Sequence, residues 1–204
     1  MEAILAFGAA LLALRLTGLL LGRWRLTRTP ELLGWAAGLG AYALGAGALA
    51  WGAAGGWSDP AFRAYYLFGG LLTAPLLGAG SLLGAGRKAA GPVALIYSGL
   101  AIGITIAVPL TDSVGGSSIP EAQAHLDLFP ARILAIAGNV AGSVALIAVA
   151  LLTIRRRPVG NSLLLAGFAL AAIGSALAGL GASETAAFIA VAAVLLYAGT
   201  VSRS

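Results

Sequence analysis

The sequence predicts an all-α, polytopic integral membrane protein: a bundle of seven transmembrane helices forming one domain over residues 1–204. Composition is the first reason, since 60% of the residues are hydrophobic, 9% are charged and the mean hydropathy is +0.98. A soluble domain carries about 25% charged residues. Length is the second reason, because seven apolar runs have about the 20 residues that a spanning helix needs. These runs are too long for strands and do not alternate in polarity.

Proline, glycine and charged residues separate the apolar runs, as turns require. The first run follows Glu2 rather than a basic segment, so we interpret it as a retained helix and not as a cleaved signal peptide. The predicted helices cover residues 2–22, 32–53, 64–84, 92–110, 131–153, 161–181 and 185–201, with an outer loop at 111–130.

Basic residues distinguish the two sides of the membrane. They gather in the connections after the first, third and fifth predicted helices, whereas the other connections carry mainly acidic residues. Lys and Arg collect in cytoplasmic loops, so we expect the N-terminus outside and the C-terminus inside, in the inner (plasma) membrane. The basic residues of these connections are Arg23, Arg25, Arg28, Arg87, Lys88, Arg155, Arg156 and Arg157.

Small residues line the predicted helices, with Gly138 and Gly142 at GxxxG spacing in the fifth. Such residues let helix backbones approach closely, and we favour packing within one chain over a dimer face. Glycines also recur at matched positions when residues 37–52 are aligned with 166–181. Either a 3+1+3 internal repeat, as found in transporter folds, or chance matches among Ala, Gly and Leu would explain this pattern.

Two polar residues lie at membrane depth, where ionisable and amide groups are costly. Arg15 is either an anion or substrate contact in a cavity, or a side chain that snorkels toward the cytoplasm. Asn139 either lines a polar cavity or forms a hydrogen bond between helices. Pro75 removes one backbone hydrogen bond and should kink the third helix.

A second group of candidates gathers at the outer ends of the third and fifth helices. Arg63, Tyr65, Tyr66 and Arg132 would form the mouth of an outward-facing pocket, or would anchor the helices at the interface with an Asp59–Arg63 ion pair. The single histidine, His125, has carboxylates nearby in a segment predicted as a short interfacial helix. We favour helix pairing with Glu121 over metal binding there.

Several functions are excluded or disfavoured. The absence of cysteine rules out disulfides, thiolate metal sites and cysteine nucleophiles. The only lysine lies in a loop, and phosphate-loop, dinucleotide and H-E-x-x-H motifs are missing. We therefore predict no enzyme activity, no catalytic residues, no cofactor and no metal. The basic turns are too short to grip nucleic acid.

One motif in the first half of the chain resembles a known family. An arginine–proline turn precedes a Trp-containing helix, and a W-x-x-x-x-[FY]-[RK]-x-[FY]-Y-L-[FY]-G pattern follows. This arrangement is similar to that of an uncharacterised family of small seven-helix integral membrane proteins of high-GC, actinobacterial-type bacteria. The resemblance covers the first three helices and implies a bacterial inner-membrane protein, with no implication for a substrate. The pattern is carried by Trp57, Phe62, Arg63, Tyr65, Tyr66, Leu67, Phe68 and Gly69.

Two functions of different classes remain. The first is a small-solute or lipid-interacting carrier, with Arg15, Asn139, Tyr65, Tyr66, Arg63 and Arg132 as candidate ligand contacts. The second is a scaffold or sensory subunit that does not transport. Its cytoplasmic arginine turns, Arg23, Arg25, Arg28, Arg155, Arg156 and Arg157, would contact anionic lipid headgroups or a protein partner. Beyond the lipid bilayer itself, a homo-oligomer is a further candidate assembly.

Overall fold

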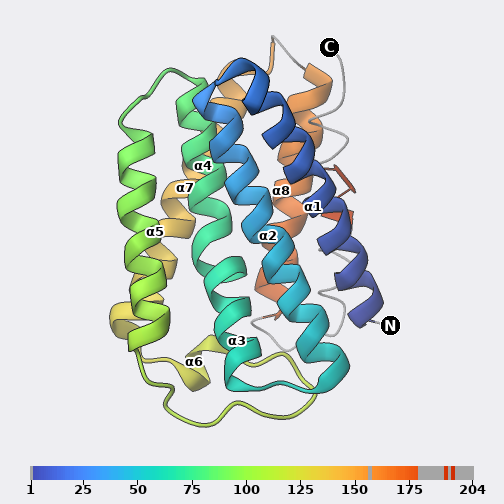
Figure 1. Cartoon of the computed structure of the whole chain (residues 1–204), viewed down its shortest axis with the longest axis vertical. Coiled ribbons are helices and arrows are strands. Elements are labelled where there is room, and N and C mark those ends of the chain that lie inside the picture. Colours follow the sequence, from blue (N-terminus) through green and yellow to red (C-terminus); the bar gives the residue numbers. More distant parts are fainter. Residues whose placement is uncertain (1, 156–157, 179–190, 193, 196–204) are drawn as a thin grey trace.

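A computed structural model describes residues 2–155, 158–178, 191–192 and 194–195, and all of its described elements are helices (Figure 1). The third spanning segment consists of three consecutive pieces, of which the middle one is π-helical. The elements are α1 (Glu2–Thr27), α2 (Pro30–Gly55), α3 (Asp59–Tyr65), η1 (Tyr66–Leu72), α4 (Thr73–Gly84), α5 (Ala90–Ala107), α6 (Ala122–His125), η2 (Leu128–Arg132), α7 (Ile133–Thr153) and α8 (Pro158–Ala178).

Five helical stretches within the described residues are long and apolar enough to cross a membrane. They correspond to the first five predicted segments. Helix α8 begins three residues before the sixth predicted segment, 161–181, while most of the seventh, 185–201, lies outside the described residues. The spans are Ala3–Thr27, Pro30–Gly55, Asp59–Gly84, Ala90–Ala107 and Leu128–Thr153.

The first helix is longer than the sequence suggested. We expected it to end at Gly22, but α1 continues to Thr27 and takes Arg23 and Arg25 into its last turns. It ends because Arg28 adopts a left-handed conformation with φ 55°, and Pro30 then begins α2. The Arg28 amide donates to the Trp24 carbonyl at 2.7 Å. Only Arg28 and Thr29 therefore form the turn.

The third span lies at the centre of the bundle, between α2 on one side and α5 and α7 on the other. Glycines make these contacts close. A Cβ atom added at Gly34 would lie 2.6 Å from the Gly80 Cα, and one added at Gly78 would lie 2.6 Å from the Gly142 Cα. The small residues thus serve packing within one chain, as the sequence favoured. Gly38 and Gly45 of α2 face the third span in the same way, while Gly52 packs against the Trp57 ring in the turn just before it.

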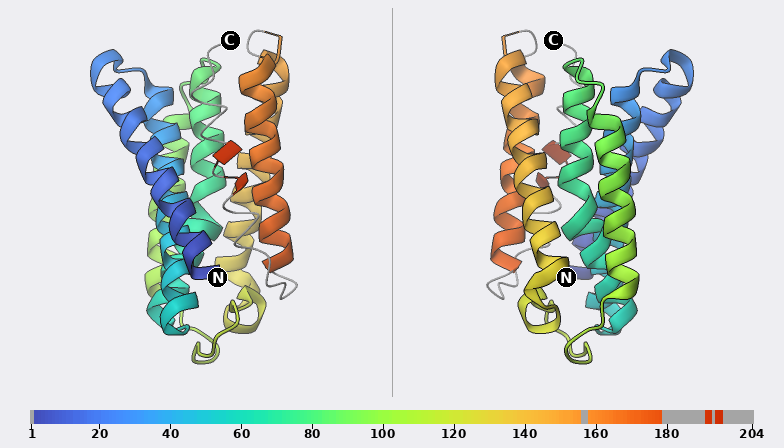
Figure 2. Two further views of the ribbon diagram at one scale, coloured as in Figure 1. Left: turned by 90° about the vertical axis from the view of Figure 1, so that its right-hand side faces the viewer. Right: turned by 90° about the vertical axis from the view of Figure 1, so that its left-hand side faces the viewer.

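The connections divide between the two ends of the bundle. The α1–α2, α4–α5 and α7–α8 turns lie at one end, and the α2–α3 turn and the long loop before α7 lie at the other (Figure 1). Toward the first end, the α1–α2 pair diverges from the α7–α8 pair (Figure 2). The long loop contains α6, which is four residues long, where the sequence predicted a short interfacial helix.

Candidate functional site

A change of helical pattern in the third span creates the most unusual polar site at membrane depth. The π-helical segment η1 bonds each amide to the carbonyl five residues earlier, whereas α4 uses the carbonyl four residues earlier. In these two patterns, the carbonyls of Gly70 and Leu71 would each require a donor from residue 75. Residue 75 is proline and has no N–H. The structure shows a π-helical stretch just before Pro75, and these two carbonyls cannot take a donor from residue 75; the expected kink itself stays a prediction.

Side chains from two other helices supply those donors. The Tyr97 hydroxyl of α5 lies 3.0 Å from the Leu71 carbonyl oxygen and 3.1 Å from that of Leu134, and its one hydrogen serves one of them at a time. The Asn139 amide of α7 donates to the Gly70 carbonyl at 2.6 Å and to the Ala135 carbonyl at 2.8 Å. Asn139 thus makes the interhelical hydrogen bond that was one of its two interpretations. These bonds fasten α5 and α7 to the π-helical segment η1 of the third span.

A groove lies beside this site, toward the end of the bundle that carries the α4–α5 turn. It has a volume of about 140 Å³ and an almost wholly apolar lining. It exists because α5 and α7 both pack against α4 but scarcely contact each other. Its walls are Pro75, Gly78, Ala79 and Leu82 of α4, Ala90, Val93, Ala94 and Tyr97 of α5, and Gly138, Ala141, Gly142 and Ala145 of α7.

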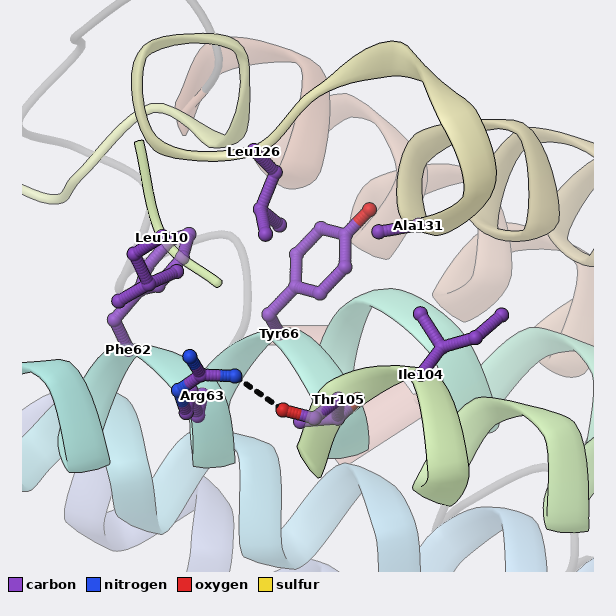
Figure 3. Close-up of a pocket in the computed structure, with 8 residues that line it drawn as sticks. All are labelled: Phe62, Arg63, Tyr66, Ile104, Thr105, Leu110, Leu126 and Ala131. Carbon is purple, nitrogen blue, oxygen red and sulfur yellow. Dashed lines mark hydrogen bonds between the residues drawn. The ribbon is translucent and has the colours of Figure 1, made fainter. Parts of the chain in front are cut away.

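A smaller pocket lies at the opposite end, where α3, α5 and the long loop meet (Figure 3). Its free volume is about 10 Å³, which is room for about one water molecule. Arg63 donates to the carbonyls of Thr105 and, at 2.9 Å, Val108, so this cation caps the carboxyl end of α5. The Tyr66 hydroxyl is buried and has no hydrogen-bond partner among the described residues.

The predicted outer cluster is thus divided. Arg63 and Tyr66 line the same pocket, and Arg132 lies close enough to interact electrostatically with Tyr66. Tyr65 instead packs edge-on against Trp57, with ring centroids 5.5 Å apart.

The prediction of an Asp59–Arg63 ion pair is wrong. The Asp59 carboxylate accepts a hydrogen bond from the Val114 amide of the long loop at 2.9 Å, whereas Arg63 binds the carboxyl end of α5. His125 packs edge-on against Phe62, with ring centroids 5.5 Å apart. No group of three His, Asp or Glu side chains that could hold a metal occurs in the described part of the chain.

The remaining candidates lie elsewhere. Arg15 is exposed on α1, which packs chiefly on α2 and is therefore separate from Asn139. The basic residues of the connections share one end of the bundle, and the Arg28 guanidinium lies 4.9 Å above the Trp24 ring. Arg156 and Arg157 lie outside the described residues. The exposed basic residues at this end are Arg23, Arg25, Arg28, Arg87, Lys88 and Arg155.

Two residues important for packing were missed by the sequence analysis. Tyr97 is one; a tyrosine in the middle of a spanning helix, away from the interfaces that tyrosine prefers, could have identified it. Asn161 is the other: its amide donates to the Ala150 carbonyl at 3.2 Å and to the Thr153 hydroxyl at 2.9 Å, which fastens α8 to α7.

No family model, curated protein or solved structure matches this chain. The resemblance carried by the Trp57–Gly69 motif therefore stays a prediction.

Proposed function

We propose that the chain is a multi-pass protein of the bacterial inner membrane, with seven spanning helices, its N-terminus outside and its C-terminus inside. The separation of charge between the two ends supports this topology. Arg23, Arg25, Arg87 and Lys88 lie at the end that would face the cytoplasm, while Asp112 lies at the other. The 3+1+3 repeat stays a prediction, because its second half is only partly described.

Within that membrane, we propose a carrier that handles lipid or another apolar substrate rather than a polar solute. The observation that supports this choice is the large apolar groove beside a mid-membrane site whose polar donors already bond to backbone. Tyr97, Asn139 and Thr73 all donate to carbonyls within the bundle. A polar solute would need free donors or acceptors, whereas an apolar one needs the kind of space that the groove offers.

Reconstitution tests transport directly. Vesicles that contain the purified protein and a phospholipid with a dithionite-sensitive fluorophore are treated with dithionite from outside. Protein-free vesicles lose only the signal of the outer leaflet. If the protein carries phospholipid across, its vesicles should lose nearly the whole signal. A loss equal to that of protein-free vesicles would contradict the carrier proposal.

Cysteine accessibility separates the lipid carrier from a polar-solute carrier, because the chain has no cysteine of its own. Thr73→Cys places a thiol directly after the π-helical segment η1 of the third span. Lys88→Cys, in an exposed turn, is the positive control. A membrane-impermeant thiol reagent applied to both sides of the membrane should label residue 88 and leave residue 73 unlabelled. Labelling at residue 73 would reveal a water-filled path and support polar transport instead.

The scaffold or sensory subunit is kept as a second candidate because six basic side chains of the described residues are exposed at one end of the bundle. Each would attract anionic headgroups or an acidic partner surface. Reversing the charge of Arg155, Arg156 and Arg157 should then weaken association with vesicles of phosphatidylglycerol or with a copurifying protein. Unchanged association would count against this candidate.

A further inference from the structure

We infer that the groove between α4, α5 and α7 binds one acyl chain of an anionic phospholipid, taken from the leaflet next to the α4–α5 turn. The inference rests on the proposed lipid-handling function and names its site and lipid class.

The groove opens toward the bilayer. Helix α5 buries only Ala90 and Ala101, so most of its surface faces outward. Val93, which forms part of the groove wall, is 63% exposed. On α7 the neighbouring Ala141 is exposed as well. A lipid chain could therefore enter from the side without any opening of the bundle.

The size of the groove fits a chain and not a helix. An apolar cavity of roughly 150 Å³ holds a benzene-sized molecule, so a groove of about 140 Å³ holds a chain segment of about six carbons. From Ala90 to Tyr97 the α5 wall runs for about 10 Å along the helix axis. A helix of a second copy is about 10–12 Å wide with its side chains, and it could only cover the groove without filling it.

The basic residues beside the groove indicate the class of lipid headgroup. The wall of the groove begins at Ala90, and Arg87 and Lys88 lie in the turn directly before it. Both are exposed, and no carboxylate lies in the turn between α4 and α5. A phospholipid whose chain occupies the groove would place its phosphate near this turn. Two cations there favour a headgroup with net negative charge over a zwitterionic one.

Photocrosslinking tests the site with the full chain in vesicles of equal parts phosphatidylcholine and phosphatidylglycerol. The probe is phosphatidylglycerol with a diazirine on one acyl chain, and peptide mapping locates the products. We expect crosslinks concentrated on the groove walls of α4, α5 and α7. Unlabelled phosphatidylglycerol should compete better than phosphatidylcholine.

Matched variants make the test specific. Val93→Trp should block the groove and remove most of the crosslinking. Leu95→Trp is its control, because Leu95 lies two residues away on the same helix, is 76% exposed and is not part of the groove. Replacing Arg87 and Lys88 by Gln should reduce the preference for phosphatidylglycerol by about fivefold per cation at low salt. Replacing Arg23 and Arg25 by Gln, at the same end of the bundle, should not.

The inference would be overturned if the crosslinks were spread evenly over all outward-facing helices and did not change in Val93→Trp, because that pattern would indicate ordinary boundary lipid. So would an unchanged headgroup preference after loss of Arg87 and Lys88. The dithionite assay separates the two proposals. Groove crosslinking without lipid transfer would retain the site and reject the carrier. If lipid transfer continues in Val93→Trp and no crosslinks form in the groove, the site is rejected and the carrier is retained.

Discussion

Tyr97→Phe is the sharpest test of how the π-helical segment η1 is held in the bundle, because it removes one hydroxyl and changes little else. The hydroxyl shares its one hydrogen between the Leu134 carbonyl and the Leu71 carbonyl, for which Pro75 offers no N–H. Hydrogen bonds between membrane helices contribute about 0.6 kcal/mol on average and about 1.7 kcal/mol at most. Since this carbonyl would lose its donor inside the bundle, we expect a loss of about 1–2 kcal/mol in the free energy of unfolding.

Tyr66→Phe is the matched control. It removes a hydroxyl that is also buried but has no hydrogen-bond partner in the part of the chain that the structure describes, so stability should stay unchanged or rise by up to about 1 kcal/mol. Reversible unfolding in mixed micelles with increasing dodecyl sulfate, followed by circular dichroism, measures both variants.

A third variant links the effect to the proline. Pro75→Ala restores an N–H that can bond the Leu71 carbonyl, so Tyr97→Phe should cost less in that background than in the original chain. Two results would refute the claim that Tyr97 supplies the donor that Pro75 lacks. One is an equal loss in the free energy of unfolding from Tyr97→Phe in the two backgrounds. The other is an equal effect of Tyr97→Phe and Tyr66→Phe.

Three further predictions concern helix contacts, the carboxyl end of α5 and the long loop before α7. Gly78→Ala should destabilise the bundle by about 1–3 kcal/mol in the same unfolding assay, because its Cβ would meet the Gly142 backbone; Gly99→Ala, which has open space around it, should not. Arg63→Gln should cost about 1.5–3 kcal/mol through the loss of two hydrogen bonds from a charged donor. Arg63→Lys should recover only part of this stability, since an ammonium group lacks the fork that reaches two carbonyls. Asp59→Ala should release the segment at Val114 and speed limited proteolysis of the long loop before α7, whereas Asp59→Asn, which keeps an acceptor, should change it little.

The helices could be predicted from the sequence because bilayer thickness sets their length and apolar character sets their position. The error at the end of α1 has a local cause. Arg23 and Arg25 were assigned to a turn because they are charged and follow Gly22, yet arginine is a good helix former, one glycine does not end a long apolar helix, and no proline occurs before Pro30.

The candidate sites were less predictable, because they depend on contacts between distant segments. Pro75 indicated a kink, but the sequence could not show that Tyr97 and Asn139 would bond to the carbonyls beside it. Arg63 was paired with Asp59 by spacing alone, whereas the nearest unsatisfied acceptors belong to the end of α5, more than forty residues later in the chain. The apolar groove arises from the spacing of three helices and leaves no motif in the sequence.

The π-helical segment also has a consequence for how the third span tolerates changes in length. A π-helical turn holds an extra residue compared with an α-helical one, because each amide reaches back one residue further. Deleting one residue between Tyr66 and Leu72 could therefore be absorbed by conversion of this stretch to an ordinary α-helix, with the packing faces of α3 and α4 kept in register. The same deletion in the middle of α2 would rotate everything after it by about 100° and turn its glycines away from the third span.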